Sequence, residues 1–165
     1  ISLRARWANL SPNQPLNNAR VYEIRRIDPF FVGSKSSFTW VKNTDNAVDG
    51  DVDSYARIDY FWGEQDHEDF LHLQSYLGDL NSVTFSIKTD PSAPGSILHI
   101  EGERGEDDWS LLESIDLNES RTTKIELPNT RAYVNSDGYL SIRTRWEADS
   151  PNHDAYVNEV WRETD

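Results

Sequence analysis

The chain has 165 residues, of which 36% are hydrophobic and 12% aromatic, enough for one domain of ordinary size with its own core. Its formal net charge of -13 argues against nucleic acid and anionic membranes as partners, because phosphate groups are bound by basic surfaces. There is no cysteine, and no apolar run approaches the roughly 20 residues that span a membrane. This composition favours cations and neutral molecules as ligands.

Residues 1–19 have loop composition and are predicted to form an irregular lead-in or a linker. Residues 20–165 are predicted to form a single β-sandwich domain. The chain begins at Ile1 and contains no methionine, so we expect a fragment of a longer protein, in which a signal sequence could have preceded it.

Short segments of β-type or alternating apolar residues follow, separated by glycine, proline and aspartate. The predicted strands cover residues 20–27, 37–41, 55–60, 70–77, 83–87, 97–101, 109–115, 122–127, 139–146 and 155–162. Segment 70–77 also fits a helix, but Gly78 and Asp79 lead directly from it into the next strand. About ten short strands without a convincing helix predict an all-β, antiparallel β-sandwich of jelly-roll type.

Alternation is strictest in residues 83–87 and in residues 139–146. In the second of these, Leu140, Ile142 and Trp146 fall on one face, and Arg143 and Arg145 on the other. Both segments are therefore predicted to be half-buried strands.

An acidic turn lies between the second and third predicted strands. Asp49, Asp51 and Asp53 alternate along it, and Gly50 favours a tight turn. Calcium takes six to eight oxygen ligands, and a compact turn can present several at once. The alternative is an acidic surface turn without an ion. An EF-hand is excluded, because counting from Asp49 puts Ser54 where the glycine should stand and Tyr60 where the glutamate should stand.

Two short motifs resemble discoidin-type (coagulation-factor type C) domains and family 32 carbohydrate-binding modules, within the galactose-binding-like superfamily. The first is Ala47-Val48-Asp49-Gly50-Asp51 followed by Ser54, although Ala56 stands where these domains usually have tryptophan. The second is the closing Val157-Asn158-Glu159-Val160, where the glutamate of these domains completes a calcium site. The resemblance implies a jelly-roll sandwich whose first and last strands bring Glu159 to the acidic turn.

Strand alternation places Glu159 on the same face as Val157 and Trp161, and a carboxylate on an apolar face needs a partner such as a cation. With the resemblance, this predicts one structural Ca²⁺ ion. The predicted ligands are the side chains of Asp49 and Glu159, the hydroxyl or carbonyl of Ser54, and the carbonyls of Val48 and Asp51.

Six tryptophans and seven tyrosines are many for this length, and exposed aromatic rings can stack on sugars. Trp62 lies beside Gly63 and a run of acids, a context too polar for the core. Trp146 ends its strand on the core side, so a core-capping role is its alternative. The predicted ligand-binding residues are Trp62 and Trp146 for stacking, and Asp66, His67 and Arg145 for hydrogen bonds.

Evidence for catalysis is thin, and no catalytic residue is predicted. His67 and His72 are five residues apart, whereas zinc proteases need two histidines four apart on one helical face. No serine nucleophile elbow is present. The acids Glu101, Glu103, Asp107 and Asp108 are predicted to be solvated loop charges.

The sequence and the resemblance together predict a non-catalytic carbohydrate-binding module of a larger secreted or cell-surface protein. Its expected partners are a glycan or cell-surface glycoconjugate and neighbouring domains of the parent protein, without nucleic acid or membrane insertion. The alternatives are a protein-interaction or adhesion domain of the same fold and a small polysaccharide hydrolase or lyase. A neutral glycan suits the acidic surface better than a sulfated one.

Overall fold

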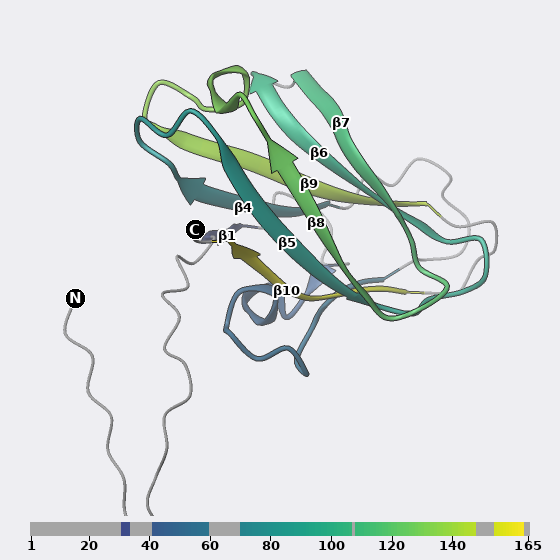
Figure 1. The fold of residues 1–165 in the computed structure, drawn as a ribbon. Coiled ribbons are helices and arrows are strands. Elements are labelled where there is room, and N and C mark those ends of the chain that lie inside the picture. Colours follow the sequence, from purple (N-terminus) through teal and green to yellow (C-terminus); the bar gives the residue numbers. More distant parts are fainter. Residues whose placement is uncertain (1–30, 34–40, 60–69, 107, 148–153, 164–165) are drawn as a thin grey trace, which may run out of the picture.

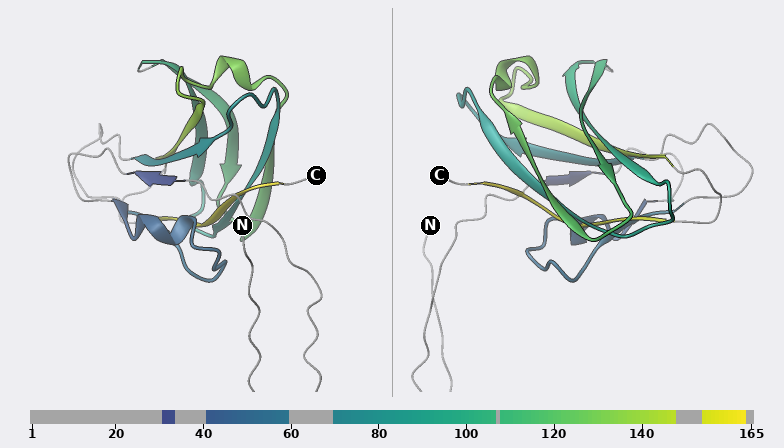
Figure 2. Two further views of the ribbon diagram at one scale, coloured as in Figure 1. Left: turned by 90° about the vertical axis from the view of Figure 1, so that its left-hand side faces the viewer. Right: turned by 45° about the vertical axis from the view of Figure 1, so that its right-hand side comes forward.

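Two five-stranded antiparallel sheets pack face to face (Figures 1 and 2). The computed structural model describes residues 31–33, 41–59, 70–106, 108–147 and 154–163. The first sheet has the order β1 (Phe31–Gly33), β4 (Phe70–Tyr76), β9 (Tyr139–Glu147), β6 (Ile97–Gly105) and β7 (Asp108–Asp116). The second has the order β2 (Val41–Lys42), β3 (Ala56–Ile58), β10 (Ala155–Arg162), β5 (Val83–Asp90) and β8 (Arg121–Leu127). The predicted all-β antiparallel sandwich is confirmed.

The core lies between the sheets and is built from alternate residues of their strands. Phe85 and Ile87 point into it from β5, while Leu98 and Ile100 do so from β6, and all four are fully buried. Alternation therefore buries one apolar row from each strand and leaves the intervening row on an outer face of the molecule.

The alternating segments form strands as predicted, and the uncertain segment 70–77 is strand β4. The predicted strands at 97–101 and 109–115 are longer than expected. Strand β6 continues to Gly105 and β7 begins at Asp108, so the two strands form a long hairpin. The predicted lead-in, the strand at 20–27 and most of the strand at 37–41 lie outside the described residues.

Helical structure in the described ranges is limited to two short 3-10 turns, η1 (Thr44–Ala47) and η2 (Thr130–Ala132). Neither has the length and apolarity that a membrane-crossing helix requires. Turn η1 leads directly into the acidic turn, so the chain there is compact.

A β-bulge in the last strand changes the face on which Glu159 lies. Val157 pairs with Thr89, but Glu159 pairs with Lys88, and the register shifts between the two pairs. Val160 then pairs with Ile87 and is buried in the core, so Glu159 points to the opposite, outer face. The expectation that Glu159 shares a face with Val157 is therefore wrong, because one extra residue breaks the alternation.

The core arrangement yields the first prediction. Replacing the fully buried Phe85 with alanine leaves a cavity between the sheets and should lower the free energy of unfolding by about 3–5 kcal/mol. Leu111→Ala is the control, because Leu111 is 58% exposed on β7 and should change stability by less than about 0.5 kcal/mol. Urea unfolding of both variants measures the difference, and equal losses would contradict this core assignment.

Candidate functional site

Consecutive side-chain-to-backbone hydrogen bonds shape the acidic turn. The Asp51 N–H donates to Asp49 Oδ1 at 2.8 Å, and the Asp53 N–H donates to Asp51 Oδ1 at 3.0 Å. Gly50 sits between the first two acids with a φ of 83°, a backbone conformation that glycine adopts without strain. These bonds hold several oxygen atoms in one small region.

Three oxygen atoms converge on the Ser54 hydroxyl. Its Oγ lies 2.9 Å from Asp49 Oδ2, 3.1 Å from the Asp51 carbonyl oxygen and 3.2 Å from the Asn46 carbonyl oxygen. A hydroxyl has one proton and can donate it to only one of the three. The cluster therefore holds more acceptors than its own donor can satisfy, which is the electrostatic environment that a hard cation prefers.

Glu159 of β10 lies beneath this turn. Its Oε2 accepts a 2.9 Å hydrogen bond from the Gly50 N–H, and the residue is only 3% exposed. Burial raises the pKa of Glu159 to about 7; the Gly50 hydrogen bond opposes this rise, and the charges of Asp49 and Asp51 add to it. A positive charge in the turn would reverse this balance, because it favours the ionised carboxylate.

The predicted metal ligands are partly brought together. Asp49, Asp51 and Ser54 share one hydrogen-bonded cluster, and Glu159 reaches it through Gly50. Val48 adjoins them, and its N–H donates to Asp45 O. Within the described ranges no three acidic or histidine side chains group in a way that could hold a metal. An ion here would thus depend on carbonyl and hydroxyl oxygens, among them the Asn46 carbonyl, which the sequence did not indicate.

A second polar cluster occupies the outer face of the first sheet, where β9 and β6 pair. Arg143 Nε donates to Glu101 Oε2 at 2.6 Å, and Arg145 Nε donates to Glu101 Oε1 at 3.3 Å. Glu101 is only 8% exposed. Its prediction as a solvated loop charge is therefore wrong, because β6 extends through it and two arginines hold its carboxylate in the sheet.

Arg145 and His99 extend this cluster to Glu147 at the end of β9. His99 Nε2 lies 2.9 Å from Glu147 Oε2, and Arg145 is also within ion-pair distance of that carboxylate. Two arginines thus face two glutamates, so their formal charges cancel in a chain with a net charge of -13. The result is a local surface with both hydrogen-bond donors and acceptors.

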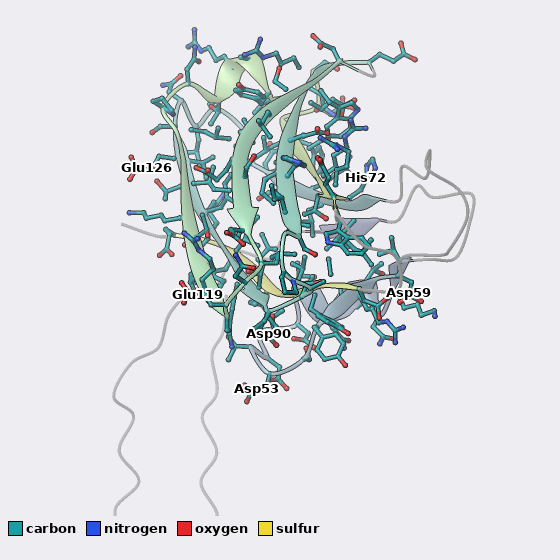
Figure 3. The ribbon with its side chains drawn as sticks, turned by 90° about the vertical axis from the view of Figure 1, so that its right-hand side faces the viewer. Asp53, Asp59, His72, Asp90, Glu119 and Glu126 are labelled. Carbon is teal, nitrogen blue, oxygen red and sulfur yellow. The ribbon has the colours of Figure 1, made fainter. Side chains whose placement is uncertain are left out.

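Trp109 lies beside this cluster on β7. The Arg143 guanidinium carbon stands 4.4 Å from the centre of the Trp109 ring, and His72 meets the same ring edge-on at 5.4 Å. We call the group formed by His72, Glu101, Trp109, Arg143, Arg145 and Glu147 the sheet-face patch. In Figure 3, His72 marks this side of the molecule, whereas Glu126 of β8 lies on the opposite side.

The structure describes two of the five predicted ligand-binding residues, Arg145 and Trp146. Arg145 belongs to the patch, while its neighbour Trp146 is partly buried against the hydrophobic core, the alternative that the sequence left open for it. Trp62, Asp66 and His67 lie outside the described residues. The segment that contains them enters β4 at Phe70, which pairs with Arg145.

Sequence reasoning missed Trp109, Glu101 and Arg143 as parts of one group. Alternation did assign Arg143 and Arg145 to the outer face. The missing signal was the pairing register, which sets Glu101 opposite Arg143 and Glu103 opposite Trp109.

The comparisons found similar solved structures but no match to a protein-family model or to a curated protein. Among solved structures, a chitosan-binding module from a chitosanase/glucanase of Paenibacillus sp. IK-5 has 10% identity and a TM-score of 0.49 over 82% of this chain and 96% of its own. A pectin-binding module has 14% identity and a TM-score of 0.48 over 84% and 93%.

A further solved structure is a family 32 module produced by Clostridium perfringens, in complex with GlcNAc-α-1,4-galactose. It has 10% identity and a TM-score of 0.46 over 88% of this chain and all of its own. The solved structures found in this comparison thus include family 32 modules. At these identities the likeness concerns overall architecture.

The buried Glu159 yields a prediction for pH dependence. Its folded pKa of about 7 lies above its ordinary value of 4.5, so the unfolded chain releases this proton first as the pH rises. Stability from this group is therefore full below about pH 4.5 and is lost as the pH rises towards 7. In chelator, Glu159→Gln should remove this loss and raise the melting temperature at pH 8 by several degrees.

The control for this experiment is Glu119→Gln, a substitution in an exposed turn, which should leave the pH profile unchanged. Thermal melts of the three proteins at several pH values measure the effect. A Glu159→Gln variant that is less stable than wild type at pH 8 would show that the ionised carboxylate stabilises the turn without an ion.

Proposed function

We propose that this chain is a non-catalytic carbohydrate-binding module of a larger secreted or cell-surface protein, and that the sheet-face patch binds a neutral glycan. The observation that carries the proposal is the balanced set of charged side chains beside the Trp109 ring. A sugar ring offers C–H groups on its faces and hydroxyls at its rim. An indole can contact the first, and oriented arginine and glutamate groups can bond the second.

The geometry of the patch suits this ligand better than a charged one. Glu101 fixes both guanidinium groups in place, so little side-chain entropy is lost when a ligand hydroxyl binds them. The formal charges cancel locally, which gives no advantage to a sulfated chain. Trp62, Asp66 and His67, in the segment that enters β4 beside Arg145, remain predicted contributors to the same site.

The test is titration with a glycan selected on a broad array. A shallow site of this kind should bind with an affinity of ~0.1–1 mM. Arg145→Ala removes a half-exposed donor and should weaken binding by about tenfold, while Arg143 still partners Glu101. Arg121→Ala on β8 of the other sheet removes an equal charge and should leave the affinity unchanged.

Trp62→Ala and Trp146→Ala complete the titration series. Loss of affinity in Trp62→Ala alone would place the stacking surface on the segment before β4. If both tryptophan variants and Arg145→Ala keep full affinity while folded, the glycan site is elsewhere. If no glycan binds the wild type, the adhesion-domain alternative takes first place, and screens for activity on polysaccharides test the hydrolase or lyase alternative.

We also propose that the acidic turn binds one structural Ca²⁺ ion. The support is the excess of acceptor oxygens around Ser54, with the Glu159 carboxylate buried next to them. Asp49, Ser54 and Glu159 would contribute side chains, and Val48 and Asp51 would contribute carbonyls. The ion would neutralise the turn and connect it to β10, so that binding energy becomes folding energy.

Melting in calcium and in chelator tests this proposal. Calcium at about 100 times its dissociation constant should stabilise the fold by about 2.7 kcal/mol. For a chain of this length that corresponds to a rise of about 5–10 °C in melting temperature. Asp49→Asn and Glu159→Gln should lose this response, whereas Asp137→Asn, in a separate turn before β9, should keep it. An unchanged wild-type melting temperature would contradict calcium binding.

A further inference from the structure

The first sheet opens into a pocket at the end opposite to the acidic turn. Strands β6 and β9 pair only up to Gly102 and Ile142, although β9 begins three residues earlier and β6 continues to Gly105. Where the two strands separate there is a pocket of about 230 Å³. In Figure 1 the tip of the β6–β7 hairpin lies at the top of the view and the acidic turn at the bottom.

Aromatic rings and polar groups line this pocket. Tyr133 lies so close to β6 that a Cβ atom on Gly102 would come within 2.8 Å of its ring, so only glycine leaves room for it there. Arg104 stands over the Tyr133 ring at 5.4 Å, and its Nη2 donates to the Tyr133 hydroxyl at 3.3 Å. Tyr139 forms part of another wall, and its ring meets that of Tyr76 edge-on.

The polar lining suits hydroxyl groups and disfavours anions. Glu103 and Glu106 contribute two carboxylates, against the single guanidinium of Arg104, which Tyr133 already engages. Ser141 and Asn135 also line the pocket, where the Ser141 hydroxyl accepts from the Gln74 amide and Asn135 Oδ1 accepts from the N–H groups of Asp137 and Tyr139. The volume is below the roughly 300–1,000 Å³ of sites for drug-sized ligands, and it suits one pyranose ring.

Strand β9 carries residues of both the pocket and the sheet-face patch. Tyr139, Ser141, Arg143 and Arg145 are alternate residues of β9, so they lie on the same face. The first two line the pocket and the last two belong to the patch. Across the sheet, Glu103 lines the pocket and pairs with Trp109 of the patch. At a rise of ~3.3 Å per residue, Tyr139 and Arg145 are about 20 Å apart.

We propose that the pocket is a second sugar subsite, and that this chain binds a neutral oligosaccharide lying along β9 from the sheet-face patch into the pocket. This inference rests on the proposed function. It adds that the ligand is a chain of several sugar units, and that affinity depends on chain length as well as on sugar identity.

The experiment uses β-1,4-linked galacto-, gluco- and manno-oligosaccharides of increasing length, titrated by calorimetry. In wild type, the affinity for the series that binds should rise by about tenfold from the shortest ligand to one long enough to reach the pocket. Gly105→Phe places a ring at the pocket, and it is compatible with the fold because a Cβ at Gly105 meets no atom within 4 Å. This variant should retain the affinity for short ligands and lose the gain from longer ones.

A double variant, Glu103→Gln with Glu106→Gln, removes the pocket carboxylates without adding bulk and should also reduce the gain. Its matched control is Glu126→Gln, on the opposite sheet face (Figure 3). If both pocket variants keep the full length dependence, or if wild type shows none, the second subsite is overturned while glycan binding stands. If short ligands are lost as well in folded variants, the pocket is the primary site and not an extension. If wild type binds none of the series and no glycan on the array, both proposals fall together.

Discussion

The hydrogen bond from Gly50 to Glu159 joins two parts of the chain that are 109 residues apart in sequence. It requires the last strand to lie beside β3, because the acidic turn leads into that strand and covers the outer face of β10. Bringing such distant segments together costs conformational entropy, which the core and the β10–β5 and β10–β3 ladders must offset. The carboxylate is buried as a consequence of this closure, and its raised pKa records the cost of desolvation.

The bulge in β10 makes this contact possible. Val157 and Val160 are three residues apart, so in a regular strand their side chains would point to opposite faces. The extra residue between Val157 and Glu159 lets both valines point into the core. The bulge places the Glu159 side chain on the outer face, where it accepts the hydrogen bond from Gly50 of the acidic turn. The bulge in β10 is therefore required for the hydrogen bond between Gly50 and Glu159.

Periodicity predicted most of the strands, since residues such as Phe85, Ile87, Leu140 and Ile142 repeat at every second position and are buried. It could not predict register, which depends on partners far away in sequence. That is why Arg143 was assigned to the correct face while its ion pair with Glu101 was not foreseen. The acidic turn could be predicted from the sequence because its residues are close neighbours along the chain. The contribution of the Asn46 carbonyl was not, because it arises from the path of the backbone through η1.

Within the described part of the chain, β7 and β8 each form one edge of a sheet and pair with a strand on one side alone. Such edges can recruit another chain and start aggregation. Exposed charges punctuate both strands here: Asp108, Glu113 and Asp116 on β7, and Arg121, Lys124 and Glu126 on β8. Two copies that paired through their β7 edges would bring these acidic side chains against one another, and like charges on paired strands are destabilising. This repulsion hinders pairing of copies through their β7 edges when the domain is at high local concentration.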